Sequence, residues 1–123
     1  MDKKVLIVED DKLLREMMFR KLEKEGYEVS AVMDGAVAFD KIKEFKPDII
    51  LLDLILPGSN GFEILEKVKR EEEFKETPVI VLSNLGQKSE IDKGMELGAI
   101  DYLVKAHFTP TEVAEKIKNL LSS

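Results

Sequence analysis

The sequence of 123 residues contains no cysteine, no tryptophan and a single histidine, His107. Without cysteine there is no disulfide framework, thiolate metal site or cysteine nucleophile, as expected in a reducing compartment. No apolar stretch approaches the roughly 18 residues that cross a bilayer, and no secretory signal precedes the first predicted strand. A net charge of −6, with lysines interleaved among glutamates, argues against a nucleic-acid surface. We expect a cytoplasmic protein that binds neither membranes nor nucleic acid directly.

Strand-like and helix-like segments alternate five times along the chain. Apolar runs predict strands at about residues 4–9, 27–32, 48–53, 78–83 and 101–104, each followed by a helix. The second strand alternates in polarity, which favours an edge position, whereas the first, third and fourth are continuously apolar, as in strands covered on both faces. The sequence therefore predicts a three-layer, doubly wound α/β domain of the flavodoxin type, with five helices and a five-stranded parallel sheet in the order 2-1-3-4-5.

Two of the predicted helices have distinctive sequences. The last helix has the clearest start, because Thr109, Pro110 and Glu112 form an N-cap, a first helical residue and a capping box. The helix at about 88–97 has few apolar residues, and Gly94 and Gly98 weaken it further. We therefore expect this helix to be held less firmly than the others.

Five reactive side chains follow the predicted strands. Glu9 and Asp10 follow the first strand, Asp53 the third, Ser83 the fourth and Lys105 the fifth. The carboxyl ends of parallel strands meet at one edge of a sheet, where ligands bind. Three carboxylates about 5 Å apart repel one another by roughly 3 kcal/mol per pair, so a compensating cation is expected. Oxygen ligands of this kind suit Mg²⁺, or Mn²⁺ in its place.

Asp53 is the predicted nucleophile. A carboxylate beside a cation can attack a phosphoryl donor to form an acyl phosphate. Lys105 would supply positive charge to one phosphoryl oxygen, and Ser83 would donate a hydrogen bond to another. The plainer interpretations are that Asp10 and Asp11 only cap a helix, that Lys105 is a surface lysine and that Ser83 forms a turn. The joint placement of these residues at strand ends argues against them.

Two other protein classes share this fold or this nucleophile. A flavin or nucleotide carrier needs a glycine-rich phosphate cradle, whereas the first loop here is acidic, and no such motif occurs. A haloacid-dehalogenase-like phosphatase would need a second aspartate where Ile55 stands. His107 has no partner cluster and is expected to have an ordinary surface or core role.

Four segments carry a resemblance to a known family, in its order and spacing, over essentially the whole chain. They are Glu9-Asp10-Asp11, Asp53 to Gly61 with Pro57, Leu82-Ser83, and Tyr102 to Lys105. Together they resemble the receiver domain of two-component response regulators. The resemblance implies a single receiver domain over residues 1–123, with no output domain in this chain. It also implies a phosphorylation-controlled binding switch rather than an enzyme, with at most slow autodephosphorylation.

The resemblance further implies roles for individual residues. Asp53 would accept the phosphoryl group from a sensor histidine kinase or a histidine phosphotransfer protein. Glu9 and Asp10 would hold Mg²⁺ (or Mn²⁺) together with Asp53 and the backbone carbonyl of Ile55. Lys105 would pair with a phosphoryl oxygen.

The same resemblance implies a switch. Ser83 would move toward the phosphoryl group and Tyr102 would swing inward. A downstream partner would then bind the face made by the fourth helix, the fifth strand and the fifth helix. The protein would be a monomer or a weak, phosphorylation-dependent dimer.

The chain departs from the family pattern in three places. Ala106 replaces the usual proline, so we expect a trans peptide bond there, since a cis bond would cost about 3 kcal/mol. Asn84 replaces a small residue, and Leu56 a methionine. The resemblance implies that Ile55 and Leu85 occupy positions that tune loss of the phosphate; both are apolar, which predicts slow dephosphorylation. These departures leave open a phosphorylation-independent, receiver-like interaction module.

Overall fold

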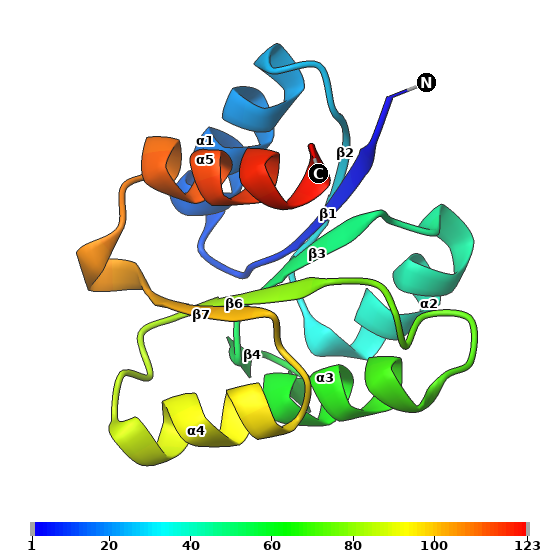
Figure 1. Ribbon diagram of the computed structural model, residues 1–123, viewed down its shortest axis with the longest axis vertical. Coiled ribbons are helices and arrows are strands. Elements are labelled where there is room, and N and C mark those ends of the chain that lie inside the picture. Colours follow the sequence, from blue (N-terminus) through cyan, green and yellow to red (C-terminus); the bar gives the residue numbers. More distant parts are fainter. Residues whose placement is uncertain (1, 123) are drawn as a thin grey trace.

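The computed structural model describes residues 2–122 and contains one central parallel sheet (Figure 1). Its strands lie in the order β2-β1-β3-β6-β7, and every neighbouring pair is parallel. This order confirms the predicted topology and the edge position of the second strand. The strands are β1 (Lys4–Val8), β2 (Glu28–Val32), β3 (Ile49–Leu52), β6 (Val79–Ser83) and β7 (Asp101–Val104).

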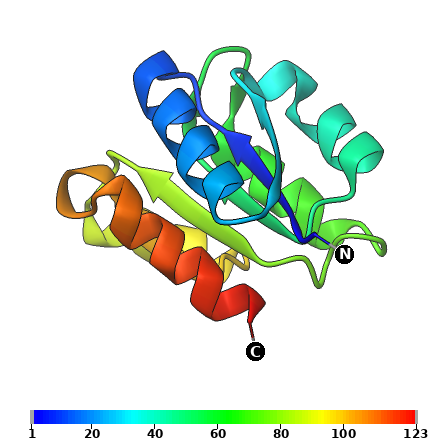
Figure 2. The same cartoon turned by 90° about the horizontal axis from the view of Figure 1, so that it is seen from above.

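Helices cover both faces of the sheet, so the domain has three layers (Figures 1 and 2). Within residues 2–122, α1 (Lys12–Lys24) and α5 (Pro110–Leu121) pack together on one face. The other face carries α2 (Gly35–Phe45), α3 (Gly61–Arg70) and α4 (Lys88–Glu96). None of these helices has the length and apolarity that a membrane span requires.

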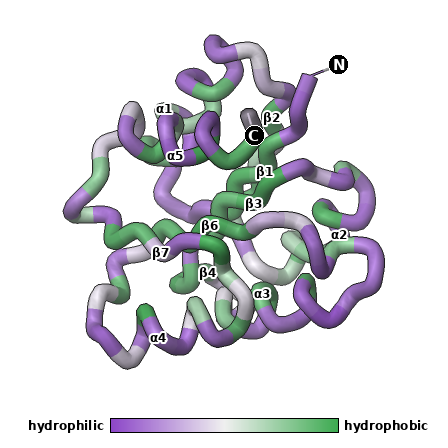
Figure 3. The backbone as a smooth tube through the Cα atoms, viewed as in Figure 1, coloured by the Kyte–Doolittle hydropathy of each residue, from purple (hydrophilic) through white to green (hydrophobic). Residues whose placement is uncertain are grey.

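The sheet divides the core into two apolar clusters. Successive strand side chains point to opposite faces, so Val5 and Ile7 of β1 join the cluster under α1 and α5, whereas Leu6 and Val8 join the cluster under α2, α3 and α4. Burial on both faces explains why β1, β3 and β6 are continuous apolar runs. Figure 3 shows this apolar centre along the strands, with hydrophilic residues on the outer helices.

Helix caps place two of the acidic residues in different roles. The Asp11 carboxylate caps α1 by accepting a hydrogen bond of 3.1 Å from the Leu14 N–H, which leaves Asp10 outside the cap.

The predicted capping box of α5 is confirmed: the Glu112 N–H donates to the Thr109 hydroxyl at 3.2 Å, and the Thr109 N–H donates to the Glu112 carboxylate at 2.9 Å.

Two short elements near the strand ends lie outside the sequence predictions. β4 (Ile55–Leu56) and β5 (Ser59–Asn60) form a small antiparallel hairpin where only a turn was expected. A turn of 3₁₀-helix, η1 (Lys105–His107), follows β7 directly. Both β1 and β3 end one residue earlier than predicted, so Glu9 and Asp53 stand just beyond the strand ends.

Candidate functional site

The predicted carboxylates form one cluster at the carboxyl edge of the sheet. β1 and β3 are neighbours, with Val8 opposite Leu52, so the residues that follow them emerge side by side. Oxygen atoms of Glu9, Asp10 and Asp53 all lie within 4.8 Å of one another. Glu9 and Asp53 are only 3% and 4% exposed, whereas Asp10 is exposed. The strands thus bring together the three residues that the sequence singled out.

Lys105 occupies the space between two of these carboxylates. Its ammonium lies 2.9 Å from the Glu9 carboxylate and 2.8 Å from Asp53 Oδ2. The lysine lies in η1, directly after the edge strand β7. In the sheet, β6 lies between β7 and β3, the strand that precedes Asp53. Sequence reasoning predicted a cation for these carboxylates but not that the chain supplies one itself.

Burial and charge shift the pKa values of two groups in the cluster. Burial raises the pKa of the Glu9 carboxyl to about 7, outweighing the hydrogen bonds from Lys105 and from the Asp11 N–H; the charge of Asp53 adds to the rise. Burial lowers the pKa of the Lys105 ammonium, but its hydrogen bonds to Asp53 and Glu9 outweigh burial and raise that pKa overall. At neutral pH, both the charged and the neutral form of Glu9 are therefore populated.

A cavity of about 390 Å³ opens over Asp53. One Asp53 oxygen accepts a hydrogen bond of 3.1 Å from the Ile55 N–H, and the other accepts from Lys105. Ile55 is 53% exposed at the rim. The lining residues are Asp10, Asp11, Asp53, Ile55, Asn84 and Lys105.

The donor set of this cavity fits a hard divalent cation. Carboxylates from Glu9, Asp10 and Asp53 offer oxygen atoms only, and they are close enough to share one ion. Mg²⁺ and Mn²⁺ prefer such ligands, and Mg²⁺ keeps several waters beside a few carboxylates. The exposed Asp10 and the open cavity leave room for those waters.

Ser83 and Tyr102 are connected through the loop that follows β6. The Ser83 hydroxyl is fully buried and accepts a hydrogen bond of 3.3 Å from the Leu85 N–H, so it does not line the cavity. The Tyr102 hydroxyl donates to the Leu85 carbonyl at 2.6 Å, and burial raises the pKa of this phenol to about 12. Tyr102 is 9% exposed, so its ring lies buried beside this loop.

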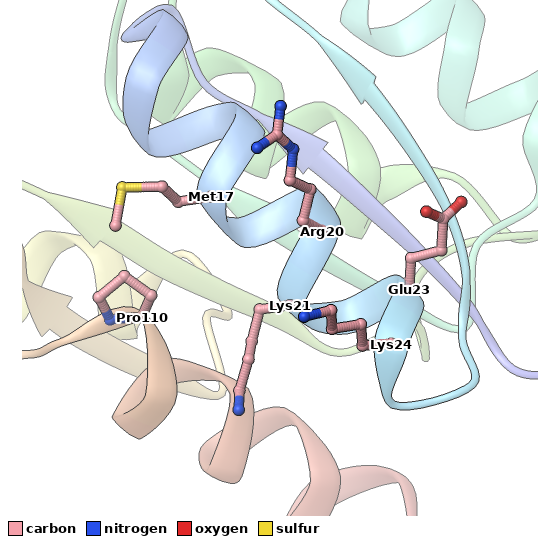
Figure 4. A pocket seen from close by; sticks show the side chains of 6 residues that line it. All are labelled: Met17, Arg20, Lys21, Glu23, Lys24 and Pro110. Carbon is pink, nitrogen blue, oxygen red and sulfur yellow. The ribbon is translucent and has the colours of Figure 1, made fainter.

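The largest groove described lies elsewhere, between α1 and the start of α5. It measures about 470 Å³, and Figure 4 shows its side chains spread along α1 rather than converging. No group of three possible metal ligands is found there among residues 2–122. His107 lies exposed in η1 and belongs to no such group either. The groove is lined by Met17, Arg20, Lys21, Glu23, Lys24 and Pro110.

The sequence matches one known protein family over most of its length. Residues 5–118 match the family described as the response regulator receiver domain. The chain belongs to this family. As a receiver domain it is a phosphoacceptor module of two-component signalling rather than an enzyme, and its acidic cluster is the metal-binding site typical of that class.

Solved receiver structures resemble this one over nearly their whole length. A putative response regulator from Chloroflexus aurantiacus is 34% identical, with 100% of both chains covered and a TM-score of 0.90. The BeF3-activated receiver domain of RstA from Klebsiella pneumoniae is 26% identical, covering 98% of this chain and 100% of that one, with a TM-score of 0.88. The Mn²⁺-bound response regulator Rcp1 is 27% identical, covering 98% and 92%, with a TM-score of 0.81.

Ala106, which stands where the family usually has proline, does not keep Lys105 from the acidic cluster. The peptide bond before Ala106 is trans, as predicted, and no cis peptide bond occurs within residues 2–122. Lys105 nevertheless reaches both carboxylates. A proline after the lysine is therefore not required to bring its ammonium to this cluster.

Proposed function

We propose that Asp53 of this receiver domain accepts a phosphoryl group from the phosphohistidine of a sensor histidine kinase or a histidine phosphotransfer protein. The observation that carries the proposal is the position of the Asp53 carboxylate. It is buried, opens onto a cavity and lies within 4.8 Å of two further carboxylates and 2.8 Å from an ammonium. Relatives include a receiver domain solved in BeF3-activated form.

The reaction would form one bond and break another. An Asp53 oxygen attacks phosphorus, the bond between phosphorus and the donor imidazole nitrogen breaks, and that nitrogen takes the electron pair. Asp53 becomes an acyl phosphate, and Lys105 turns from the carboxylate to a phosphoryl oxygen. Glu9 and Asp10, with Asp53 and the Ile55 carbonyl, would hold Mg²⁺ or Mn²⁺, which supplies positive charge to the transferred group. The Mn²⁺-bound relative supports this assignment.

The proposed output is a change in partner binding. Ser83 and Tyr102 would couple the state of Asp53 to the face formed by α4, β7 and α5, and a downstream protein would bind there. We further propose that residues 1–123 act as one receiver domain, as a monomer or a weak phosphorylation-dependent dimer, in the cytoplasm, where receiver domains typically act.

Intact-mass spectrometry tests the proposal. With acetyl phosphate and Mg²⁺, we expect wild type to gain the mass of one phosphoryl group, and Asp53→Asn to gain none. Asp10→Asn should lose most of the gain, because Asp10 belongs to the carboxylate cluster. Asp34→Asn is a matched control that should behave as wild type, since Asp34 caps α2 outside the cavity lining and Asn also caps a helix. No mass gain in wild type would overturn the proposal and favour a phosphorylation-independent interaction module.

A further inference from the structure

The Tyr102 ring rests against a position in α4 that has no side chain. Gly94 is the buried residue of α4. A Cβ atom built on Gly94 would lie 2.8 Å from Tyr102 Cδ2 and 3.0 Å from Cε2, closer than side chains normally approach. The space that the ring occupies therefore exists only because residue 94 is glycine.

The backbone itself does not explain a glycine at this place. Gly94 lies in the interior of α4, and its φ is not in the left-handed region that favours glycine. Glycine in a helix interior is less favourable than alanine. α4 is already poor in apolar contacts, with only partly buried Ile91 and Leu97 packed against the core beside Gly94. The close contact with the Tyr102 ring, and not the backbone conformation, therefore accounts for glycine at this position.

The same ring is connected to the phosphoacceptor edge through one loop residue. Leu85 is held at both ends: its N–H donates to the buried Ser83 hydroxyl at 3.3 Å, and its carbonyl accepts from the Tyr102 hydroxyl at 2.6 Å. A ring displaced by a side chain at position 94 would lose the second of these bonds. The Leu85 backbone would then keep only its hydrogen bond to the Ser83 hydroxyl of the two described here.

We propose that Gly94 is a positioning residue for Tyr102, because its missing side chain admits the ring to the buried position against α4. Alanine at position 94 would shift the ring toward solvent and break its hydrogen bond to the Leu85 carbonyl. The switch proposed for Tyr102 would then lose its buried position. This inference rests on the proposed function for its link to signalling, but the position of the ring can be measured separately.

Tyrosine fluorescence can report how exposed the Tyr102 ring is. It has no tryptophan and two tyrosines, so Tyr27→Phe leaves Tyr102 as the sole strong emitter. In that background, we expect weak acrylamide quenching of Tyr102 fluorescence. Gly94→Ala should raise the quenching constant several-fold, both in buffer alone and with beryllium fluoride and Mg²⁺. Equal quenching in the two variants, or strong quenching without Gly94→Ala, would overturn the inference.

A double-mutant cycle provides a second test. In a Tyr102→Ala background, Gly94→Ala meets no ring and should raise the thermal midpoint, because alanine favours helix. With Tyr102 present, the same change should give no rise or a fall. Equal rises in both backgrounds would contradict the inference.

The quenching test does not depend on whether Tyr102→Ala folds. If wild type takes no phosphoryl group but the quenching results hold, the proposed function fails and the role of Gly94 stands.

Discussion

Replacing Lys105 by methionine keeps an unbranched side chain only one atom shorter and removes the ammonium between Glu9 and Asp53. The lysine side chain is 15% exposed and each carboxylate side chain 4%, so the two ion pairs are largely shielded from solvent. Breaking a buried ion pair by removing one partner costs about 3–5 kcal/mol. We expect the lower end of that range, because the cavity is open and Glu9 can take up a proton. For a domain of this length, a loss of 3 kcal/mol lowers the thermal midpoint by roughly 10 °C.

Metal should reverse this loss. A cation shared by the carboxylates replaces the missing positive charge, and in the variant no ammonium competes for the same oxygens. A site at a 100-fold excess of metal over Kd gains about 2.7 kcal/mol. The midpoint of Lys105→Met should therefore rise more with Mg²⁺ than that of wild type. Below pH 6 the deficit in EDTA should shrink, because Glu9 is then protonated and needs no cation: its pKa is about 7 beside Lys105, and loss of the lysine raises that pKa further.

Thermal melts followed by circular dichroism, at pH 8 in EDTA and in MgCl₂, measure these differences. Lys116→Met is the matched control. Lys116 pairs with Asp101 at 3.6 Å, and both side chains are more than a third exposed, so its loss should change stability by about 0–1 kcal/mol. If Lys105→Met melts with wild type in EDTA, or gains no more from Mg²⁺, Lys105 does not balance these carboxylates and the electrostatic argument is wrong.

Two further predictions concern Glu9 and Ile55. The folded-state pKa of Glu9 lies above its ordinary value of 4.5, so the metal-free fold binds the extra proton and loses stability as pH rises from about 4.5 through 7, by at most about 3 kcal/mol. Urea unfolding in EDTA should show this fall, and a Glu9→Gln variant with the same pH slope would contradict it. Ile55→Asn should shorten the lifetime of phosphorylated protein severalfold, because its amide can position water where isoleucine cannot. Mass spectrometry over time measures this, with Met95→Asn, an exposed residue of α4, as control; unchanged decay for Ile55→Asn would count against it.

Much of the fold follows from patterns that are local in the sequence. Continuous apolar runs mark strands buried on both faces, and the alternating run at residues 27–32 marks the edge strand β2. The hairpin of β4 and β5 escaped prediction because two-residue strands are too short to show a period. Turn residues such as Pro57 and Gly58 indicated only that the chain reverses.

The components of the site were predictable, but their mutual contacts were not. Lys105 and Glu9 are 96 residues apart, and no sequence pattern shows which oxygens a lysine will approach. Ser83 is predicted to donate to the phosphoryl group, and its spacing does not reveal that its hydroxyl also accepts a hydrogen bond from the Leu85 N–H. Gly94 had the signal of a weakened helix, and only the fold reveals the aromatic ring beside it. These contacts depend on tertiary packing, which sequence spacing does not encode.

The division of the core by the sheet has a consequence for communication within the molecule. Tyr102 belongs to the cluster beneath α2, α3 and α4, whereas its neighbour Leu103 belongs to the cluster beneath α1 and α5. A movement of the ring therefore acts directly on the layer that holds α4. The layer that holds α5 would receive it through β7, because this strand contributes side chains to both layers.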